Sequence, residues 1–523
     1  MTFMMIRTVI IAVFSCWAGF LTMRHNMHMF QLNGYKNDEH INWLRKNKRQ
    51  QWLSGFGLIT GIIRLFLPVL ALDILIFITL LFDIQVYRAF RRINTKKKLV
   101  YTARVKRMIF TILIISAAAA ALTWIFAGLD PVSGVLMIIV SSQWFMNIIA
   151  NIINHPLEKG ISDWYINDAK RILRESTGLK VIGITGSYGK TSMKSYLNTL
   201  LSGRFSVLAT PGNYNTPLGV TITVRKYLKP THEIFLCEMG ARRVGQIKEL
   251  CDIVHPDLGV ITSVGPQHLE TFFTMENIRK TKFELADAIP EDGMVFLNGD
   301  NDLILEQAPS YTRKTFYCTK PVEGGYYAKD IKVSQFGTDF TVVCPDGSEE
   351  EFSMKLIGAH NVINVTGAIA VANYLGMSLK ELKVPVRRLV PVEHRMQMKE
   401  QGPVTIIDDA YNSNPIGSKA AVETLAMFDG IRILITPGMV ELGNEEREYN
   451  RKFGTYAAGC CDYILLVGKK HTEPIKEGAL SEGFPEGKCL VYDKLEEALA
   501  YAYAIKGQGH KYILLENDLP DNY

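Results

Sequence analysis

The sequence has no cysteine pair with the spacing of a zinc site or a redox motif. Its eight cysteines include no C-x-x-C, and Cys460 and Cys461 are adjacent. We interpret them as reduced thiols in a cytosolic domain, without a disulfide framework. Net charge is also small, +6 from 58 basic and 52 acidic residues, so overall charge gives no reason to expect a nucleic-acid partner. The chain lacks low-complexity tracts and any internal repeat beyond general α/β alternation.

Acidic residues are absent from residues 87–107, which carry nine Lys or Arg between apolar segments. A basic stripe can bind nucleic acid, but this position favours a cytoplasmic loop facing anionic lipid. Met108–Leu129 contains 22 uncharged residues and Pro131–Ile153 contains 23. Each is long enough to cross about 30 Å of hydrocarbon as a helix. Because only Asp130 and its neighbours separate them, we expect a hairpin with a short outer turn.

Two earlier apolar segments allow more than one interpretation. Thr8–Met23 is short for a span, and we favour a retained anchor over a signal peptide because no small-residue cleavage site is evident. Trp52–Phe82 is apolar over 31 residues but contains Arg64, Pro68 and Asp73. One tilted helix or a helical hairpin would fit, and the basic flanks favour the hairpin. The two charges indicate either a functional site or side chains that reach the membrane surface.

The apolar region therefore predicts a multi-pass protein of the cytoplasmic membrane, with four or five helices in residues 1–155. In either count the basic loop is cytoplasmic, and the chain leaves the membrane on the cytoplasmic side near His155. The remaining domains would then face the cytoplasm, where ATP is available.

From about Ser162, short β-branched runs alternate with amphipathic helices, which predicts an α/β fold with largely parallel sheets. The expected strands are 181–185, 233–240, 258–264 and 294–300 in a first series, and 405–411, 432–438, 463–468, 489–493 and 511–517 in a second. We expect helices at 416–427 and 494–503 and a small β-rich insert at 335–355. A junction near Val390–Gln397 separates the series and gives domains 1–155, 156–392 and 393–523.

A glycine-rich turn between a strand and a helix predicts a nucleotide site. In "KVIGITGSYGKTSMK", residues 180–194, Gly186 and Gly189 permit tight backbone turns. Lys190 is placed to contact the β- and γ-phosphates, and the hydroxyl of Thr191 to ligate Mg²⁺. The motif departs from G-x-x-x-x-G-K-[ST], because Ile184 occupies the first glycine position.

A carboxylate and an imidazole follow two other expected strands. Glu238 lies in "CEMGARR" and His268 in "VGPQHLETF". Because the carboxyl ends of parallel strands line the crevice that also holds the phosphate loop, both side chains are candidates to hold a divalent ion. A lone histidine is more often a structural residue, so this assignment depends on the surrounding motifs.

Those motifs resemble the Mur ligases, the ATP-dependent amide-bond-forming family of peptidoglycan synthesis. The resemblance covers residues 176 to about 470. Its pieces include "TPGNYNTPLGV", "KTKFELADAIPEDGMVFLNGDND", "GAHNVINVTGAIAVANYLG", "HRMQ", "DDAYNSNPIGSKAA" and "PGMVELGNEE". With "EMGARRVGQI", the last two are similar to the branch that adds D-Ala-D-Ala to UDP-MurNAc-tripeptide.

The resemblance implies roles for individual residues. Lys190, Lys282, His268 and Arg395 would act in catalysis, and Thr191, Glu238, His268 and a carbamylated Lys282 would hold two Mg²⁺ ions. The residues implied at ATP are Thr185, Gly186, Ser187, Gly189, Lys190, Thr191, Ser192, Asn298, Asp300, Asn364, Arg395, Asp409, Tyr411 and Asn412. On residue type alone, Lys282 would be an ordinary surface lysine, and its assignment depends on the motif "KTKFEL".

The implied fold is a P-loop ATPase-like central domain followed by a Rossmann-like C-terminal domain. The implied reaction is ATP-dependent amide synthesis through an acyl phosphate, in peptidoglycan and cell-wall biogenesis. The substrates would be a muropeptide, free or lipid-linked, and an amino acid or D-Ala-D-Ala, with membrane lipid as a further partner. Alternatives are a ligase for another amide polymer, such as poly-γ-glutamate, and a non-catalytic ATP-binding scaffold. Oligomeric state stays open.

Three departures from the family limit this inference. Membrane-like sequence replaces the N-terminal domain that holds the UDP-sugar, and His394 replaces a glycine before Arg395. The branch ends its last strand with a Lys-Gly-Ser-Arg-like turn, whereas this chain reads "LLENDLPDNY". Glu516, Asp518 and Asp521 then form either a frayed polar tail or a site for an amine or cationic substrate.

Overall fold

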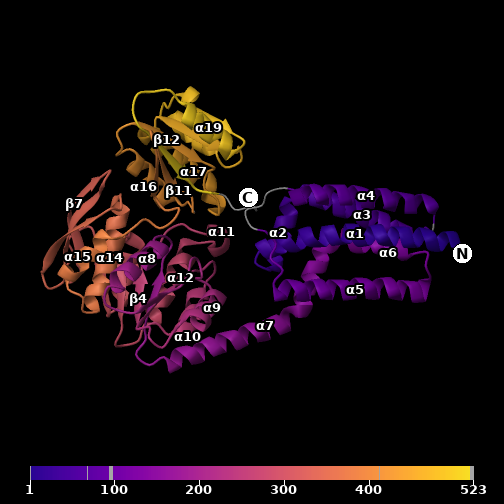
Figure 1. Cartoon of the computed structure of the whole chain (residues 1–523), viewed down its shortest axis with the longest axis horizontal. Helices are drawn as coiled ribbons and strands as arrows, with labels where there is room; N and C mark the ends of the chain where they lie inside the picture. The colour runs from indigo at the N-terminus through magenta and orange to yellow at the C-terminus, as the bar shows by residue number, and fades with distance from the viewer. Residues whose placement is uncertain (1, 68, 93–97, 412, 519–523) are drawn as a thin grey trace. The chain divides into compact units, whose positions relative to one another are not determined.

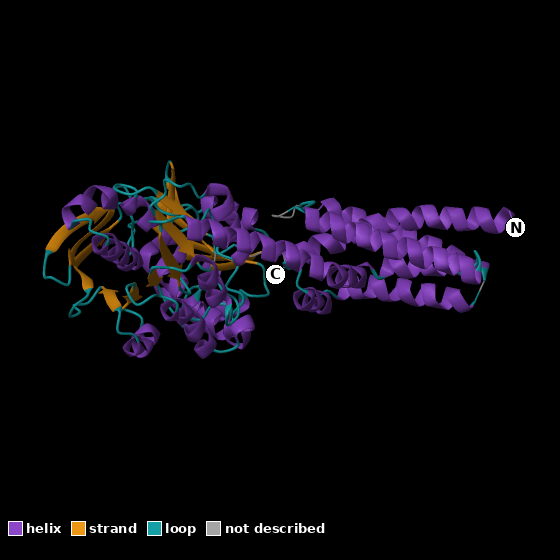
Figure 2. Cartoon of the chain, turned by 90° about the horizontal axis from the view of Figure 1, so that it is seen from below, coloured by secondary structure: helices purple, strands orange, loops and turns teal. Residues whose placement is uncertain are grey.

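The chain divides into a helical unit up to Asp163 and an α/β unit from Trp164 onward. The computed structural model describes residues 2–67, 69–92, 98–411 and 413–518. Figure 1 labels the elements, and Figure 2 shows the described strands, all of which belong to the α/β unit.

The helical unit contains the apolar segments. Its helices are α1 (Thr2–Leu32), α2 (Asn37–Lys46), α3 (Lys48–Phe66), α4 (Leu70–Arg92), α5 (Ala103–Ala127), α6 (Val132–Ser141) and the first part of α7 (Gln143–Glu175). Three stretches are long and apolar enough to cross a membrane: Met5–Leu32, Leu70–Ala89 and Ala103–Ala127. If the bent pair α6–α7 is counted as one further span, the number of candidate spans is four. The expected segment 52–82 is two helices, α3 and α4, while the count of four or five spans stays a prediction.

The expected continuous span over residues 131–153 is instead bent by 78° between α6 and α7. Polar side chains at the break explain the bend. Gln143 Nε2 and Ser142 Oγ both donate to the Ile139 carbonyl oxygen, at 2.9 and 3.4 Å. Side chains that bond backbone carbonyls compete with the helical hydrogen-bond ladder, so the helix ends and a new one begins.

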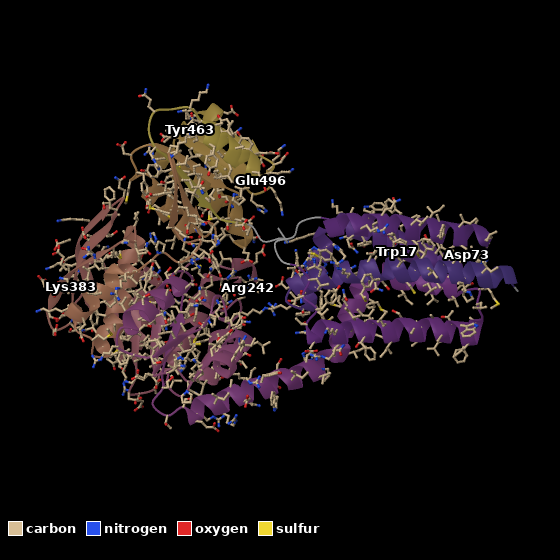
Figure 3. All side chains as sticks on the ribbon, in the orientation of Figure 1. Trp17, Asp73, Arg242, Lys383, Tyr463 and Glu496 are labelled. Carbon is tan, nitrogen blue, oxygen red and sulfur yellow. The ribbon has the colours of Figure 1, made fainter. Side chains whose placement is uncertain are left out.

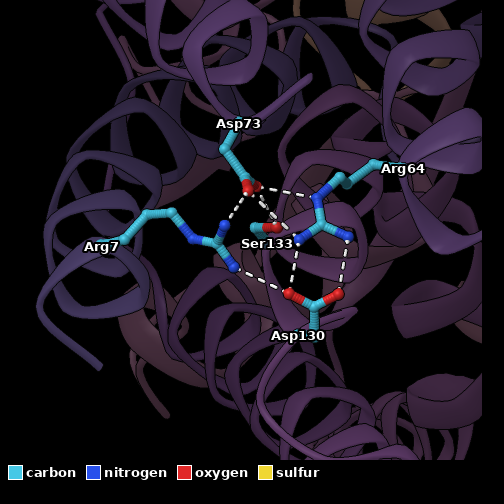
Figure 4. A network of polar contacts seen from close by, with 5 residues as sticks. All are labelled: Arg7, Arg64, Asp73, Asp130 and Ser133. Atoms are coloured by element: carbon cyan, nitrogen blue, oxygen red, sulfur yellow. Dashed lines mark hydrogen bonds and ion pairs between the residues drawn. The ribbon is translucent and has the colours of Figure 1, made fainter. Parts of the chain in front are cut away.

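Four charged side chains form one network inside the helical unit (Figure 4). Arg64 Nε lies 2.9 Å from Asp73 Oδ1, and Arg64 Nη2 lies 3.0 Å from Asp130 Oδ1. Arg7 contacts the same two carboxylates at 2.9 and 2.7 Å, and Ser133 Oγ donates to Asp73 at 2.6 Å. With two cations and two anions the network is neutral. Arg64 and Asp73 are 1% and 2% exposed, so they pair inside the unit rather than reach its surface.

Removal of one charge from this network should destabilise the helical unit. In the Asp73→Asn variant, the buried Arg64 and Arg7 would share Asp130, and breaking a buried ion pair costs about 3–5 kcal/mol. We expect a lower thermal unfolding midpoint for detergent-purified protein. The double variant Arg64→Leu/Asp73→Leu keeps the Arg7–Asp130 pair and should lose less stability. A single variant as stable as the wild type would contradict a structural role.

The first sheet of the α/β unit has nine strands in the order β2-β3-β1-β4-β5-β6-β7-β8-β9. They are β1 (Lys180–Thr185), β2 (Val207–Ala209), β3 (Ile234–Glu238), β4 (Leu258–Ile261), β5 (Met294–Asn298), β6 (Lys314–Cys318), β7 (Tyr326–Ser334), β8 (Gly337–Val343) and β9 (Glu349–Met354). Pairing is parallel from β2 to β7 and antiparallel through β9. The flanking helices are α8 (Lys190–Leu201), α9 (Pro217–Tyr227), α10 (Gln246–Val254), α11 (Leu269–Phe272), α12 (Met275–Asp287), α13 (Asp302–Gln307), α14 (Ala359–Tyr374) and α15 (Leu379–Arg387).

Both faces of this sheet are covered. Ile182 and Leu236 point into a core built with α8 and α14, while Val181 and Phe235 point into a second core with α10 and α12. This explains why the central strands read as continuous apolar runs rather than as alternating patterns. Because β1, β3 and β4 are parallel, their carboxyl ends meet at one edge, where the sequence places its candidate site residues.

The second sheet has six strands in the order β10-β11-β15-β12-β13-β14, parallel except for β10. They are β10 (Gln397–Gln401), β11 (Val404–Asp409), β12 (Ile431–Thr436), β13 (Tyr463–Val467), β14 (Cys489–Tyr492) and β15 (Lys511–Glu516), with helices α16 (Pro415–Leu425), α17 (Glu446–Cys460), α18 (Glu473–Ser481) and α19 (Leu495–Ala504). Asp409 and Glu516 are register partners at the carboxyl ends of adjacent strands. Tyr411, Ser413 and Asn414 follow β11 at this end of the second sheet.

Candidate active site

The glycine-rich loop joins β1 to α8 and depends on two glycines. Gly186 has a φ of +151°, and a Cβ there would lie 2.1 Å from the Thr262 hydroxyl oxygen. Gly189 has a φ of +80° and is the N-cap of α8. Other residues are strained in these conformations, so glycine is required. Ser187 fixes the loop, because its Oγ donates to the Gly265 carbonyl at 2.9 Å. The N-terminus of α8 therefore follows directly on the glycine-rich loop, which is the arrangement of an anion-binding site.

Lys190 lies against the backbone of this loop. Its Nζ donates to the carbonyl oxygens of Gly186 and Ser187 at 2.6 and 3.0 Å. Burial lowers the pKa of Lys190 to about 8; Glu238 opposes this shift and Arg395 adds to it. The amine is thus held where a phosphate-loop lysine contacts the terminal phosphates of a nucleotide.

Glu238 ends β3 and is 2% exposed. Its Oε1 accepts hydrogen bonds from Thr191 Oγ1 and Asn215 Nδ2, both at 3.2 Å, and its Oε2 lies 2.9 Å from Lys194 Nζ. Burial raises the pKa of Glu238, but Lys194 and Lys190 outweigh burial and lower it overall. The structure therefore brings an ionised carboxylate to the hydroxyl of Thr191.

His268 meets Glu441, which follows β12. His268 Nδ1 is in hydrogen-bond contact with one Glu441 oxygen, and Arg242 Nη2 lies 3.3 Å from the other (Arg242 is labelled in Figure 3). Both His268 and Glu441 are in left-handed conformations, with φ of +54° and +65°. Such strain costs about 1–3 kcal/mol per residue and is concentrated at functional sites. Burial lowers the pKa of His268, and the Glu441 contact opposes that shift.

Lys282 lies on α12 and is 2% exposed, so it is not the surface lysine that residue type alone predicts. Its Nζ is 5.8 Å from the centre of the Phe272 ring. Burial lowers the pKa of Lys282 well below its usual value, and nearby Lys190 adds to this shift. An uncharged amine is nucleophilic, which is the form that carbamylation requires.

The residues expected on the nucleotide side mainly fix loops around the site. Asn298 Nδ2 donates to the Thr262 carbonyl at 2.7 Å, next to the Cβ position excluded at Gly186. Asp300 accepts from Thr319 N at 2.9 Å and Thr319 Oγ1 at 2.6 Å. Asn364 Oδ1 lies 3.0 Å from the position that a Cβ on Gly189 would take. Asn298 and Asn364 thus border the loop, whereas the Asp300 carboxylate is engaged elsewhere.

Arg395 and Asp409 border the site from the second sheet. The Arg395 guanidinium lies over the Tyr411 ring, 4.6 Å from its centre, and its buried Nε has no hydrogen-bond partner among the described residues. Burial raises the pKa of Asp409 to about 6, and Arg395 opposes that shift. His394 Nδ1 contacts Asp408 Oδ2 at 2.8 Å, and the backbone of His394 is left-handed, a conformation that favours glycine. The predicted Asn412 lies outside the described residues.

Several polar contacts of the site were not assigned from the sequence. Lys194 follows Lys190 by four residues, so their shared helix face was a usable signal. Arg242 and Glu441 lie in the quoted motifs "EMGARR" and "GMVELG", but only the tertiary structure brings them to His268. Ser413 was part of "DDAYNSNP" without a role.

Glu516 is not part of a frayed tail. It is 1% exposed at the end of β15, accepts a hydrogen bond from Thr436 Oγ1 at 3.1 Å, and is in short contact with Ser413 Oγ. Burial raises the pKa of Glu516 to about 8; Asp409 adds to this shift, and the two hydroxyls do not cancel it. Of the two alternatives for the acidic end, the frayed tail is therefore wrong for Glu516, because β15 continues to that residue.

The raised pKa of Glu516 should therefore make the free energy of unfolding fall as the pH rises. Glu516→Gln should remove this part of the pH dependence. Between the ordinary glutamate pKa of 4.5 and about 8, the folded chain keeps a proton that the unfolded chain releases. Stability from this group is thus lost as pH rises, on the order of a few kcal/mol. We expect the unfolding midpoint of Glu516→Gln, minus that of the wild type, to increase from pH 5 to pH 8. A constant difference would contradict the shift.

The polar side chains of the site fit ATP, and some of them fit Mg²⁺. Thr191 and Glu238 supply the hydroxyl and carboxylate oxygens that Mg²⁺ prefers. Among the described residues, no three His, Cys, Asp or Glu side chains form a metal-binding group. A second ion at His268 would therefore need the additional anionic oxygens that a carbamate on Lys282 provides.

Known proteins match this arrangement. Residues 184–372 match the Mur ligase middle domain, and residues 394–515 match the Mur ligase glutamate ligase domain. The UDP-N-acetylmuramoyl-tripeptide–D-alanyl-D-alanine ligase of Bacillus subtilis (strain 168) is 33% identical over 335 residues, 63% of this chain and 71% of that protein. The chain belongs to the Mur ligase family.

Other relatives place this Mur ligase near the same branch. The enzyme with that name from Escherichia coli (strain K12) is 29% identical over 65% of this chain and 78% of its own. The crystal structure of MurF ligase from Thermotoga maritima in complex with ADP superposes with a TM-score of 0.62 at 27% identity, over 68% of this chain and 80% of that one. MurF from Acinetobacter baumannii gives the same TM-score over 77% of its chain.

Proposed function

We propose that this Mur ligase joins D-Ala-D-Ala to the carboxylate of a peptidoglycan precursor, using ATP. The observation that carries the proposal is one continuous site. Thr191 Oγ1 donates to Glu238 Oε1 at 3.2 Å, and His268 contacts Glu441, which follows β12 of the second sheet. The charges of Glu238 and Arg395 shift the pKa of Lys190, whose own charge lowers the pKa of Lys282. The named activity of the 33%-identical relative supports the choice of D-Ala-D-Ala as the amine.

The chemistry follows from the weakness of a carboxylate as an acylating group. Transfer of the γ-phosphoryl group of ATP to the substrate carboxylate gives an acyl phosphate and ADP. Lys190 and Arg395 would hold the phosphates in line and neutralise charge. Mg²⁺, when bound at Thr191 and Glu238, would supply further charge neutralisation. The amine then attacks the acyl carbon, the bond to phosphate oxygen breaks, and an amide and inorganic phosphate result.

Glu441 and Arg395 suggest how water is excluded from the intermediate. The Glu441 contacts with His268 and Arg242 join the loop after β12 to the loops after β3 and β4. The acyl phosphate would thus lie in a site enclosed by both sheets, which limits its hydrolysis.

Three finer assignments belong to the same proposal. We keep the domain limits 1–155, 156–392 and 393–523, the catalytic, ATP and metal roles deduced from the resemblance, and a multi-pass location in the cytoplasmic membrane. The candidate spans support the location by length and composition. A lipid-linked muropeptide as the acid substrate stays a prediction, as does a role for membrane lipid.

The test is phosphate and ADP release by detergent-purified full-length protein. We expect release only when ATP, a UDP- or lipid-linked muropeptide tripeptide and D-Ala-D-Ala are all present, with a product heavier by the dipeptide. Comparing the two carriers decides the lipid question. A panel that includes both forms and yields no ADP would contradict the proposal, whereas turnover with glutamate alone would favour the amide-polymer alternative.

A further inference from the structure

Ser413 links the surface of the site to a buried carboxyl group. It borders a small cleft together with Gln267, His268 and Glu441. On its other side, the Ser413 hydroxyl contacts Oε1 of Glu516. One hydroxyl therefore separates the cleft from a carboxyl that is 1% exposed.

The surrounding backbone fixes this arrangement. Ser413 N donates to Asn517 Oδ1 at 3.2 Å, and Asn517 Nδ2 donates to the Gly438 carbonyl at 2.6 Å. Thr436 Oγ1 holds the second oxygen of Glu516 at 3.1 Å. The Glu516 side chain is thus held by the loop that follows β11 and by the last residue of β12, and its first oxygen is directed at Ser413.

Amide synthesis creates a need for such a group. An α-amino group has a pKa of about 7.7–8.0, so an amine substrate is largely an ammonium ion near neutral pH. An ammonium ion has no lone pair and cannot attack the acyl phosphate until it loses a proton. The two titratable side chains that line the cleft, His268 and Glu441, are engaged because they contact each other.

We propose that Glu516 accepts, through the Ser413 hydroxyl, the proton that the amine substrate must lose. The ammonium gives a proton to Ser413 Oγ while Ser413 gives its own to the Glu516 carboxylate, leaving a neutral amine, unchanged Ser413 and a neutral carboxyl. The amine lone pair then forms the C–N bond, phosphate leaves with the C–O electron pair, and the second nitrogen proton passes to phosphate or water. Glu516 acts through Ser413 and positions that hydroxyl.

The electrostatics of Glu516 suit this transfer. Burial raises its pKa to about 8, and Asp409, which faces it from β11, adds to the shift. The charge of Arg395 opposes the rise in the pKa of Asp409, while Ser413, Thr436 and Asn517 are uncharged. A carboxyl matched in pKa to an α-amino group exchanges a proton with little free-energy cost, which is where general-base catalysis is most effective.

Hydroxylamine gives a test that separates this step from the rest. It is a weak base, already unprotonated at neutral pH, and converts an acyl phosphate into a hydroxamate. In Glu516→Gln we expect amine-dependent ADP release to fall about 10²-fold at pH 7.5. Hydroxamate formation should stay within about twofold of the wild type, and Ser413→Ala should show the same pattern. The exposed Glu496, labelled in Figure 3, provides the control Glu496→Gln, which should change neither reaction.

The pH profile adds a readout that a purely structural role would not change. Amine-dependent kcat/KM of the wild type should rise with an apparent pKa near 8, and Glu516→Gln should lose that inflection while keeping the hydroxylamine profile. Full amine activity in Glu516→Gln, or equal loss of both reactions, would overturn the inference.

The inference rests on the proposed function, but different experimental results would contradict each of them. A wild-type protein that forms no hydroxamate with any muropeptide acid contradicts both. A wild type that forms hydroxamate, beside a Glu516→Gln variant unimpaired with amine, contradicts the role of Glu516 alone.

Discussion

Lys190→Ala is expected to reduce ADP release by about 10³-fold or more, the range seen when one charged group that stabilises phosphoryl transfer is lost. The structure gives the reason. Lys190 is the cation at the glycine-rich loop, with its Nζ within 3.0 Å of two loop carbonyls. Neither nearby lysine can replace it, because Lys194 is paired with Glu238 and Lys282 is buried with a lowered pKa.

The matched control is Lys248→Ala, which removes an exposed lysine that pairs with Asp252 four residues later. It should leave turnover unchanged, because exposed i,i+4 pairs contribute only about 0.3–0.5 kcal/mol. Thermal unfolding of both variants should match the wild type. A folded Lys190→Ala protein that keeps more than a tenth of wild-type turnover would contradict the role of Lys190 and favour the scaffold alternative.

Much of the α/β unit could be predicted from the sequence, because its signals are local. The buried parallel strands β1, β3, β4 and β5 are short β-branched runs, and each lies within two residues of its predicted start. The phosphate loop is likewise local, since its glycines, Lys190 and Thr191 are consecutive. The edge strand β2 was missed because it has only three residues, Val207–Ala209, and no pattern.

Contacts between residues that are far apart in the sequence could not be predicted. His268 and Glu441 are 173 residues apart, and only the packing of the two sheets brings them into contact. Glu516 looked like part of a polar tail because its acidic neighbours dominate the local composition. Its burial depends on β15 lying between β11 and β12, which places Asp409, Glu516 and Thr436 side by side.

In the helical unit, too, local features could be predicted from the sequence and contacts between distant residues could not. Apolar length predicted α5 from residues 108–129, because hydropathy is read along the chain, whereas α4 was expected only as one half of a hairpin over residues 52–82. The pairing of Arg64 and Asp73 could not be predicted in full, because it also involves Arg7 of α1 and Asp130 of the turn between α5 and α6. Each of the four charges alone would be unfavourable in an apolar unit, but together they form a neutral network of ion pairs (Figure 4).

Lys282→Ala is the second large effect we expect, a loss of about 10²-fold that a short carboxylic acid such as formate or acetate partly restores. Burial, with a further contribution from nearby Lys190, lowers the pKa of Lys282 and so favours its neutral amine form. That amine can add to carbon dioxide, forming an N–C bond and releasing one proton, to give an anionic carbamate. Alanine leaves room for a small carboxylate to supply the same oxygens beside His268.

The neighbouring exposed lysine on α12 provides the control, because Lys280→Ala truncates the same type of side chain on the same helix and should have no effect. A spectroscopic readout is independent of turnover: ¹³C-bicarbonate should give a carbamate resonance in wild type and Lys280→Ala, and none in Lys282→Ala. An unimpaired Lys282→Ala would rule out the carbamate. Since among the described residues no three ordinary metal ligands converge, that result would also leave His268 as a histidine held by Glu441, with a structural role only.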